Sequence, residues 1–551
     1  CDHRPSPMYP IEIVLTMLLA VIASGYVVRM LPLSLPLPLI QIALGAVIAG
    51  VFNHGVTLDP DVFFLLFLPP LLFLDGWRIP KDGLFRDKAI ILQLALGLVV
   101  FTVVGAGVLI HWLIPAMPLA VAFALAAIVS PTDPVAVSSI ASRVPIPKRL
   151  MHILEGESLL NDASGLVSFR FAVAAAATGG FSLASASLTF AWTALAGLAL
   201  GVGFTWGVSA LQLWLARRFG EEAGSPVLAS LLIPFGAYLL AEAIDASGIL
   251  AAVAAGITMS YVELSGRALA VTRVRRAAVW DTVQFSLNGI MFVLLGEQLP
   301  GILRGAALSV AQSGHQSPWW LAAYALAITS GLVLLRLIWV SASLVVSLAG
   351  AHWPGTRRTH PPWRLVAALS LAGVRGAITM AGVMTLPLSL PDGAAFPARD
   401  LTIFLAAAVI LLSLSIAAIG LPRLLKGLQL PTEPAERQEE DRARREAAAA
   451  AIAAVDKARQ AMPHEASDAE VYTNAAARVI ALYQRRLDGS DSSAIGAAQL
   501  RKADEVERAL RLAAFRAERE KLFDMARHFQ LSDETSRKLV REIDLMETRY
   551  R

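Results

Sequence analysis

The chain carries about thirteen long apolar segments, and this pattern constrains its fold more than any other feature. A transmembrane helix needs about 20 mostly apolar residues to cross the hydrocarbon core of a bilayer. With 56% hydrophobic and only 16% charged residues, the 551-residue chain has the composition of a polytopic all-α membrane protein. The predicted spans are 9–29, 33–52, 61–77, 88–113, 117–140, 150–177, 183–216, 225–244, 247–262, 279–299, 317–348, 363–390 and 400–422.

Basic residues in the connecting loops predict an orientation. Lys and Arg collect on the cytoplasmic side of short loops. One set of alternate loops has only Arg304 and Arg399, with Arg4 in the leader, whereas the other set is basic. We therefore predict an odd number of spans in a cell inner (plasma) membrane, with the N-terminus outside and the C-terminus in the cytoplasm. The basic set contains Arg29, Arg78, Lys81, Arg86, Lys88, Arg143, Lys148, Arg149, Arg217, Arg218, Arg267, Arg273, Arg275, Arg276, Arg357, Arg358 and Arg364.

The regions outside the apolar segments complete the predicted organisation. Residues 1–8 are interpreted as a short external leader, for which a start-site artefact before Met8 and a lipid-modified Cys1 both stay open. Residues 9–427 form the predicted transmembrane domain. Residues 431–551 are charged and rich in alanine, which is typical of helices in a cytoplasmic tail. A solvated appendage and a regulatory sensor are both open for this tail, and the basic loops give no reason to expect a nucleic-acid partner.

Polar residues interrupt the fifth span, "AIVSPTDPVAVSSI". Asp133 stands between Pro131 and Pro134, and proline breaks a regular helix because it lacks an N–H donor and its ring clashes with the preceding turn. An ionisable side chain at the bilayer centre costs about 2.5–3.5 kcal/mol on insertion scales. Asp133 is therefore expected to face a protein cavity, with either a structural or a direct ion-binding role.

The sixth span contains "GESLLNDASG", which is polar where a membrane helix should be apolar. Glu157 and Asn161 are four residues apart, as are Ser158 and Asp162, so the four side chains share one broad helical face. We expect this face to meet the interior of the helix bundle.

The twelfth span, "LSLAGVRGAITMAGVM", is a counterpart in the second half of the chain. Gly373, Gly376 and Gly382 loosen the helix around Arg375. Interrupted helices in corresponding positions of two halves indicate an inverted-repeat transporter with its site near the membrane midplane. Asp133 would then neutralise the partial positive helix ends at the crossing, and Arg375 the partial negative ends.

Arg336, in "LVLLRLIWV" of the eleventh span, is a cation in an apolar helix and needs an anionic partner. Glu157 is the predicted partner, which leaves Asp162 as the unpaired acid. We interpret the pair as a buried ion pair that locks the fold, so that loss of one partner is costly.

Several of these segments resemble those of a known family. "SPTDPVAV", "GESLLNDASG", Arg336 and "GVRGAI" are similar to signature segments of the bacterial sodium/proton antiporters of the first cation/proton antiporter family, relatives of animal sodium/proton exchangers. "LPLPLIQIALGAVIAG" and "FLPPLLFLDGW" resemble the early helices of that family, so the resemblance extends from about Met8 to about Gly427.

The resemblance implies a thirteen-helix fold with separate core and dimer domains, a homodimer, and exchange of a monovalent cation, Na⁺ first, for H⁺. It implies that Glu157 pairs with Arg336. The residues that it implicates in ion binding, with the metal at Asp162, are Asp162, Asp133, Ser158, Thr132 and Asn161.

A mechanism follows from the chemistry of a buried carboxylate. Desolvation favours the protonated form, while a small hard cation prefers oxygen ligands, so that proton and cation compete for one negative site. Because Asn161 beside Asp162 does not titrate, we predict electroneutral one-for-one exchange. A K⁺/H⁺ antiporter, a cation channel and a sensor on the same scaffold remain alternatives. An intramembrane aspartyl protease would need a GxGD segment, which is absent, and we expect neither enzymatic activity nor a cofactor.

Other polar residues receive minor roles. Asp75 and Trp77 are interpreted as anchors at the membrane interface, and Arg170 as a side chain that snorkels to the interface. Asp281 is considered as a lining residue of the inner funnel.

Overall fold

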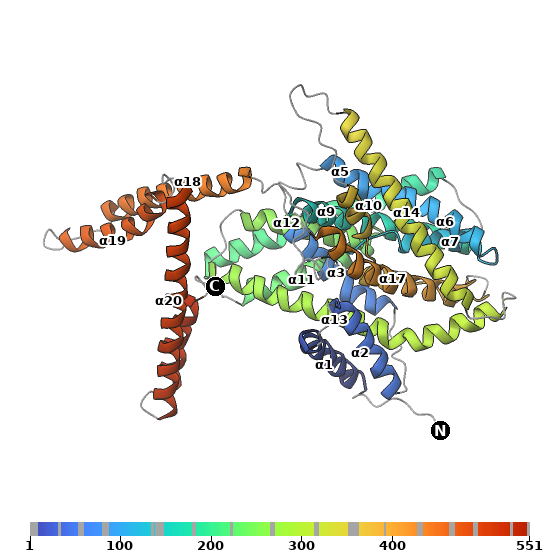
Figure 1. Ribbon diagram of the computed structural model, residues 1–551, viewed down its shortest axis with the longest axis horizontal. Coiled ribbons are helices and arrows are strands. Elements are labelled where there is room, and N and C mark those ends of the chain that lie inside the picture. Colours follow the sequence, from blue (N-terminus) through green and yellow to red (C-terminus); the bar gives the residue numbers. More distant parts are fainter. Residues whose placement is uncertain are drawn as a thin grey trace. The chain divides into compact units, whose positions relative to one another are not determined.

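In the computed structural model, the described part of the chain is almost entirely helical (Figure 1). It divides into two compact units, Cys1–Leu428 and Gln429–Arg551, each of which is considered by itself. The leader, many of the basic loop residues and Pro134 lie outside the described residues. The described residues are 9–30, 35–52, 60–79, 88–133, 137, 148–178, 183–220, 224–264, 270–312, 319–350, 363–390, 393–426, 434–461, 469–488, 494–528 and 533–547.

The predicted all-α membrane fold is confirmed, because each predicted span overlaps one or more of the described helices. Seven of the described helices are long and apolar enough to cross a bilayer, and three shorter helices are also apolar. The helices of the first unit are α1 (Tyr9–Met30), α2 (Leu37–Phe52), α3 (Pro60–Arg78), α5 (Lys88–Leu92), η1 (Gln93–Leu98), α6 (Val99–Leu113), α7 (Leu119–Ile128), α9 (Lys148–Thr178), α10 (Leu183–Phe219), α11 (Ser225–Glu242), α12 (Gly248–Leu264), α13 (Ala270–Gln312), α14 (Trp319–Gly350), α15 (Trp363–Leu371), α16 (Ala377–Met384) and α17 (Arg399–Leu425).

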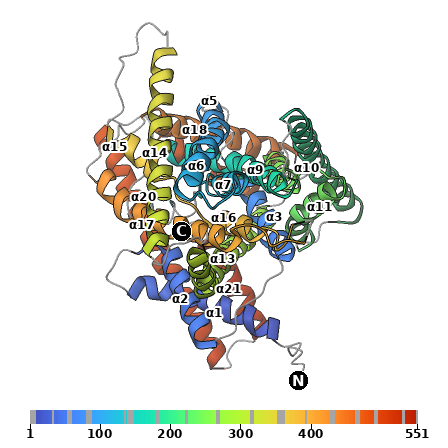
Figure 2. The same ribbon diagram turned by 90° about the vertical axis from the view of Figure 1, so that its right-hand side faces the viewer.

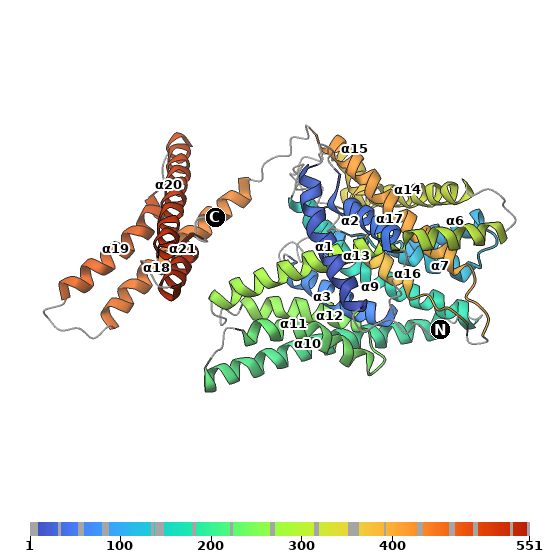
Figure 3. The same cartoon turned by 90° about the horizontal axis from the view of Figure 1, so that it is seen from below.

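These helices pack against one another within one compact unit. α9 packs against α7 and η1, and α14 and α17 pack against α15, whereas α12 lies against α3 and α10, and α13 against α2. In Figure 3, α10, α11 and α12 run alongside one another at one side of the unit. Gly45 on α2 and Gly296 on α13 allow the closest approach, because a Cβ at either position would collide with the backbone of the other helix.

Two spans are broken, as their proline and glycine content predicts. α7 ends at Ile128 and is followed by non-helical residues up to Asp133, while residues 372–376 separate α15 from α16. The two breaks meet, since the Asp133 N–H donates a hydrogen bond of 2.7 Å to the Val374 carbonyl. α16 lies between α7 and α13 and also contacts α3 (Figure 2). The crossing therefore brings four elements to one place: α3, α9, α16 and the segment after α7.

A π-helical turn, η1, supports α9 beside this crossing. A π turn changes the regular spacing of backbone hydrogen bonds and is frequent near functional sites. The Ala95 carbonyl accepts a hydrogen bond of 2.9 Å from the Ser164 hydroxyl of α9, and the Gln93 carbonyl accepts one of 3.2 Å from the Trp339 indole of α14. The position of α9 is thus fixed by polar as well as apolar contacts.

The second unit consists of two helix pairs in its described part. α18 (Pro434–Ala461) packs against α19 (Ala469–Asp488), and α20 (Ala494–Arg527) packs against α21 (Asp533–Glu547). Arg519 of α20 forms ion pairs with Asp544, at 2.9 Å, and with Glu547, both on α21.

Candidate functional site

A small cavity of about 20 Å³ lies at the helix crossing. A cavity of about 10–15 Å³ is already enough for one water molecule, so this one has room for about one water or one dehydrated ion. α3, the segment after α7, α9 and α16 all contribute to its wall. The lining residues are Asp75, Pro131, Thr132, Asp133, Ser158, Asp162, Gly376, Ile378 and Thr379.

The polar face of α9 forms one wall of this cavity. Ser158 and Asp162, one turn apart, both line the cavity and are 2% and 3% exposed. The Ser158 hydroxyl donates a hydrogen bond of 2.7 Å to the Thr132 carbonyl. Asp162 has no basic partner within hydrogen-bond distance among the described residues. This carboxylate is therefore available to a proton or a cation.

Asn161 lies behind the cavity wall instead of on it. Its side-chain amide donates a hydrogen bond of 3.0 Å to the Thr132 hydroxyl, which donates in turn to a Glu157 carboxylate oxygen at 3.2 Å. The side-chain oxygen Oδ1 of Asn161 has no hydrogen-bond partner in the described part of the chain. Three hydrogen bonds thus fix Thr132 to α9, and Asn161 contributes to the site through Thr132.

Glu157 and Arg336 form a two-pronged ion pair. Arg336 donates from Nη1 to one carboxylate oxygen of Glu157 and from Nη2 to the other, the second at 2.7 Å. Its Nε donates to the Leu369 carbonyl of α15 at 3.1 Å. Glu157 is completely buried and Arg336 almost so, so the pair joins α9 to α14 and α15 away from water.

Arg375 lies at the crossing, as expected of a residue that compensates helix dipoles. Its Nε donates a hydrogen bond of 2.8 Å to the Val129 carbonyl, directly after the C-terminal end of α7, and Nη1 donates to the Gly373 carbonyl. These carbonyls carry the partial negative charge that a cation stabilises. On the opposite side, Gly376 begins α16 beside the Asp133 carboxylate, where a Cβ would collide with it.

The position of Asp75 differs from the one predicted from the sequence. It is not an interface anchor, because it lines the cavity together with Asp133 and Asp162. In the structure Asp75 shares one face of α3 with the buried residues Leu68 and Leu71, seven and four positions earlier. The sequence does not indicate this face, because the apolar residues of this span are not confined to one side. Trp77 points elsewhere, since its indole N–H donates to Glu263 at 2.8 Å.

The other minor polar residues lie away from the cavity. Asp281 is exposed and pairs with Arg78 at 2.5 Å, and the exposed Arg170 pairs with Glu242 at 3.4 Å. Neither pair shares a lining residue with the cavity.

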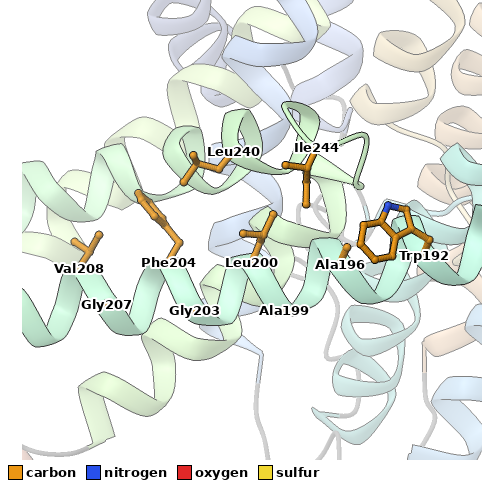
Figure 4. A pocket seen from close by; sticks show the side chains of 10 residues that line it. All are labelled: Trp192, Ala196, Ala199, Leu200, Gly203, Phe204, Gly207, Val208, Leu240 and Ile244. Atoms are coloured by element: carbon orange, nitrogen blue, oxygen red, sulfur yellow. The ribbon is translucent and has the colours of Figure 1, made fainter.

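A much larger groove, of about 680 Å³, lies between α10 and α11 (Figure 4). Small and apolar side chains form its wall, so a cation would find no oxygen ligand from a side chain there. The groove shares no lining residue with the carboxylate cavity. Its lining residues are Trp192, Ala196, Ala199, Leu200, Gly203, Phe204, Gly207, Val208, Leu240 and Ile244.

The fold and the site define a secondary transporter: a polytopic helical unit in which two broken helices cross beside buried carboxylates. Residues 14–427 match the family model described as sodium/hydrogen exchanger, transmembrane, and the chain belongs to this family. It is a multi-pass integral membrane protein, and its class of activity is monovalent cation/proton antiport.

Similar proteins agree with this assignment. An Escherichia coli (strain K12) protein named uncharacterized Na(+)/H(+) exchanger YjcE is 40% identical over 541 residues, 97% of each chain. A Bacillus subtilis (strain 168) protein named sodium, potassium, lithium and rubidium/H(+) antiporter is 43% identical over 418 residues, and the match spans 75% of this chain and 61% of that protein.

A solved structure shows the same fold. The sodium proton antiporter MjNhaP1 from Methanocaldococcus jannaschii matches with a TM-score of 0.57 at 18% identity, over 76% of this chain and 99% of that chain. At this level of identity the likeness concerns the fold alone.

Proposed function

We propose that the protein exchanges a monovalent cation, Na⁺ in the first place, for H⁺ across a bacterial plasma membrane by competition of the two ions for Asp162. The observation that supports this most directly is the pairing pattern on α9. Arg336 holds the Glu157 carboxylate on both oxygens, whereas Asp162, five residues later, lines the cavity without a basic partner among the described residues.

The cavity offers the ligands that a small hard cation prefers. Asp162 and Asp133 supply carboxylate oxygens, and Ser158 and Thr132 supply hydroxyl or backbone oxygens, as in the ligand set expected from the sequence. Asp75 adds a third carboxylate from α3. Asn161 contributes indirectly, by holding Thr132 in place.

Competition at one site produces exchange. A proton on Asp162 and a cation bound to it exclude each other, because the cation needs the ionised form of the carboxylate. If the site changes its side of exposure only when Asp162 is neutralised, each proton carried one way requires one cation carried the other way. Because the proposal assigns the change of charge to Asp162 alone among the three carboxylates of the cavity, either ion neutralises one charge, and the exchange is electroneutral with a stoichiometry of one to one.

K⁺ is the second candidate cation. The Bacillus relatives are named for antiport of sodium, potassium, lithium and rubidium, and they are 43–44% identical to this chain over the matched region. The carboxylate and hydroxyl ligands suit each of these ions, so the assay below includes all of them.

We further infer an N-terminus outside the membrane, a C-terminal tail in the cytoplasm and a homodimer. The basic loops support the orientation, and the family resemblance supports the dimer. Residues 1–8 would be the leader, and residues 431–551 the tail with either a regulatory or an assembly role.

The proposal is tested by purified protein in liposomes with an internal pH dye. Asp162→Asn should abolish exchange for Na⁺, Li⁺, K⁺ and Rb⁺, whereas Asp281→Asn, which removes an exposed carboxylate outside the cavity, should keep it. With the same potassium gradient in every sample, Na⁺ exchange by the native chain should not change when valinomycin is added to convert that gradient into a membrane potential. Full exchange by the Asp162 variant would refute the site, and a strong response to potential would refute the stoichiometry.

A further inference from the structure

We propose that Thr379 of α16 supplies a hydroxyl ligand to the transported cation and contributes to the choice among alkali cations. This proposal rests on the proposed function, because it assigns a further ligand to the same site. Thr379 is only 2% exposed, and it lines the carboxylate cavity. Its hydroxyl makes no hydrogen bond within the described part of the chain.

The missing hydrogen bond does not by itself distinguish Thr379, because the buried Thr205 hydroxyl of α10 also has no partner in the described part of the chain. Thr379 differs from Thr205 because it lines the carboxylate cavity. A threonine hydroxyl ordinarily donates to the carbonyl three or four residues earlier in its own helix. Thr329 donates in this way to Ala325 at 2.7 Å, and Thr402 donates to Ala398 at 2.9 Å. Both of these threonines are buried at least as deeply as Thr379.

The break in the twelfth span explains the difference. α16 begins at Ala377, so the residues three and four positions before Thr379 are Gly376 and Arg375, which lie before the helix. Gly376 is the extended N-cap residue of α16, with a φ of −130° and a ψ of −153°, so the carbonyl four positions before Thr379, that of Arg375, lies outside the helix. The Thr379 hydroxyl therefore lacks the acceptor four positions earlier that Thr329 and Thr402 use, and it lines the cavity.

The Thr379 hydroxyl reaches the cavity from a different element than the other candidate ligands. Ser158 and Asp162 come from α9, and Thr132 and Asp133 from the segment after α7. Thr379 belongs to the other broken helix, and Asp75 belongs to α3. With Thr379 as a ligand, the bound ion would therefore have candidate oxygen ligands from four elements: α9, the segment after α7, α3 and α16. A cation that has lost its water needs oxygen ligands on several sides, and the ion radius decides how well a fixed set of oxygens fits.

The test compares Thr379→Val, which removes the hydroxyl at nearly constant shape, with Thr379→Ser, which keeps it. Thr329→Val is the matched control, because that hydroxyl is satisfied within its own helix. Apparent KM values for Na⁺, Li⁺ and K⁺ and the maximal rates are measured in liposomes. Thr379→Val should raise the apparent KM for Na⁺ about tenfold, as for loss of one contact to a charged group, with a maximal rate within about twofold of native.

The remaining variants should behave differently. Thr379→Ser should keep the KM for each cation within about threefold of native, with the ratio of the Li⁺ and K⁺ values shifted, and Thr329→Val should match the native protein. As a readout that does not require transport, Na⁺ should raise the thermal unfolding temperature of the native protein and of the Thr379→Ser variant more than that of Thr379→Val. Thr379→Ala replaces the valine variant if the latter does not fold.

The outcomes separate the two proposals. Exchange by the Asp162→Asn variant would refute the proposed function itself. Loss of exchange in Asp162→Asn, together with native KM values and native Na⁺ stabilisation in Thr379→Val or Thr379→Ala, would refute the Thr379 ligand alone. An equal rise of the KM in the serine and valine variants would also refute it, because the hydroxyl would then be irrelevant.

Discussion

Two acidic side chains on α9, Glu157 and Asp162, are both buried but have opposite surroundings. Glu157 is bound on both oxygens by Arg336, so its negative charge is compensated within the protein. Asp162 faces a cavity with two more carboxylates and has no basic partner among the described residues, and in our proposal a proton or a cation from outside the protein compensates its charge. A difference of five positions thus separates a side chain that holds the fold from one that is suited to transport.

The structural role of Glu157 can be tested by replacing it with glutamine. Glu157→Gln leaves the Arg336 guanidinium buried without an anion, and we expect a loss of about 3–5 kcal/mol in the free energy of unfolding. Arg170→Ala breaks an exposed ion pair and should cost at most about 1 kcal/mol, with exchange retained. Thermal unfolding in detergent measures both. A stable Glu157→Gln protein would show that the pair does not hold α9 in place.

At the scale of elements, the crossing depends on close backbone contact between the two broken spans. Asp133 donates its N–H to Val374, and Arg375 donates to Val129, so each break satisfies polar backbone groups of the other. Gly376 is necessary here because the Asp133 carboxylate occupies the space where a Cβ would stand. The two breaks therefore form one structural unit.

Gly376→Ala should disturb this unit. The added Cβ pushes against Asp133, and overpacking of this kind costs about 1–3 kcal/mol. We expect a lower unfolding temperature and a large loss of exchange. Gly207→Ala on α10 is the control, because a Cβ there meets no atom within 4 Å. If both alanine variants exchange cations equally well, the close approach at Gly376 is not required for transport.

Much of this arrangement is predictable from residue types alone. Pro131 and the glycines around Arg375 indicate the two breaks, and the polar spacing of "GESLLNDASG" indicates the inward face of α9. Asp75 was assigned wrongly because an acid near the end of an apolar run has the same sequence pattern whether it faces the interface or a cavity. No sequence pattern indicates a role for Thr379, because the loss of the acceptor four positions earlier depends on where α16 begins, at Ala377.

At the scale of the whole molecule, the carboxylate cavity and its supporting ion pair lie entirely within the first compact unit. The E. coli relative matches 97% of this chain and thus includes the region of the tail, whereas the B. subtilis relative matches 75% of it. The tail is therefore expected to be separable from ion exchange.

A chain truncated after Leu428 tests this expectation. It should insert, fold and exchange cations with the native KM and a rate within about threefold of native, because no site residue is removed. The pH dependence of the rate is compared in the same liposomes, and a shift would assign a regulatory role to the tail. A folded truncated protein without exchange would show that the tail is part of the transport machinery.

The size of the carboxylate cavity has a consequence for the cation that enters it. A space of about 20 Å³ cannot accept a sodium ion with its hydration shell. The ion must shed nearly all of its water on the way in and regain it on the way out, and the side chains around it must replace that water within one step. Dehydration and rehydration of the cation are then part of every turnover.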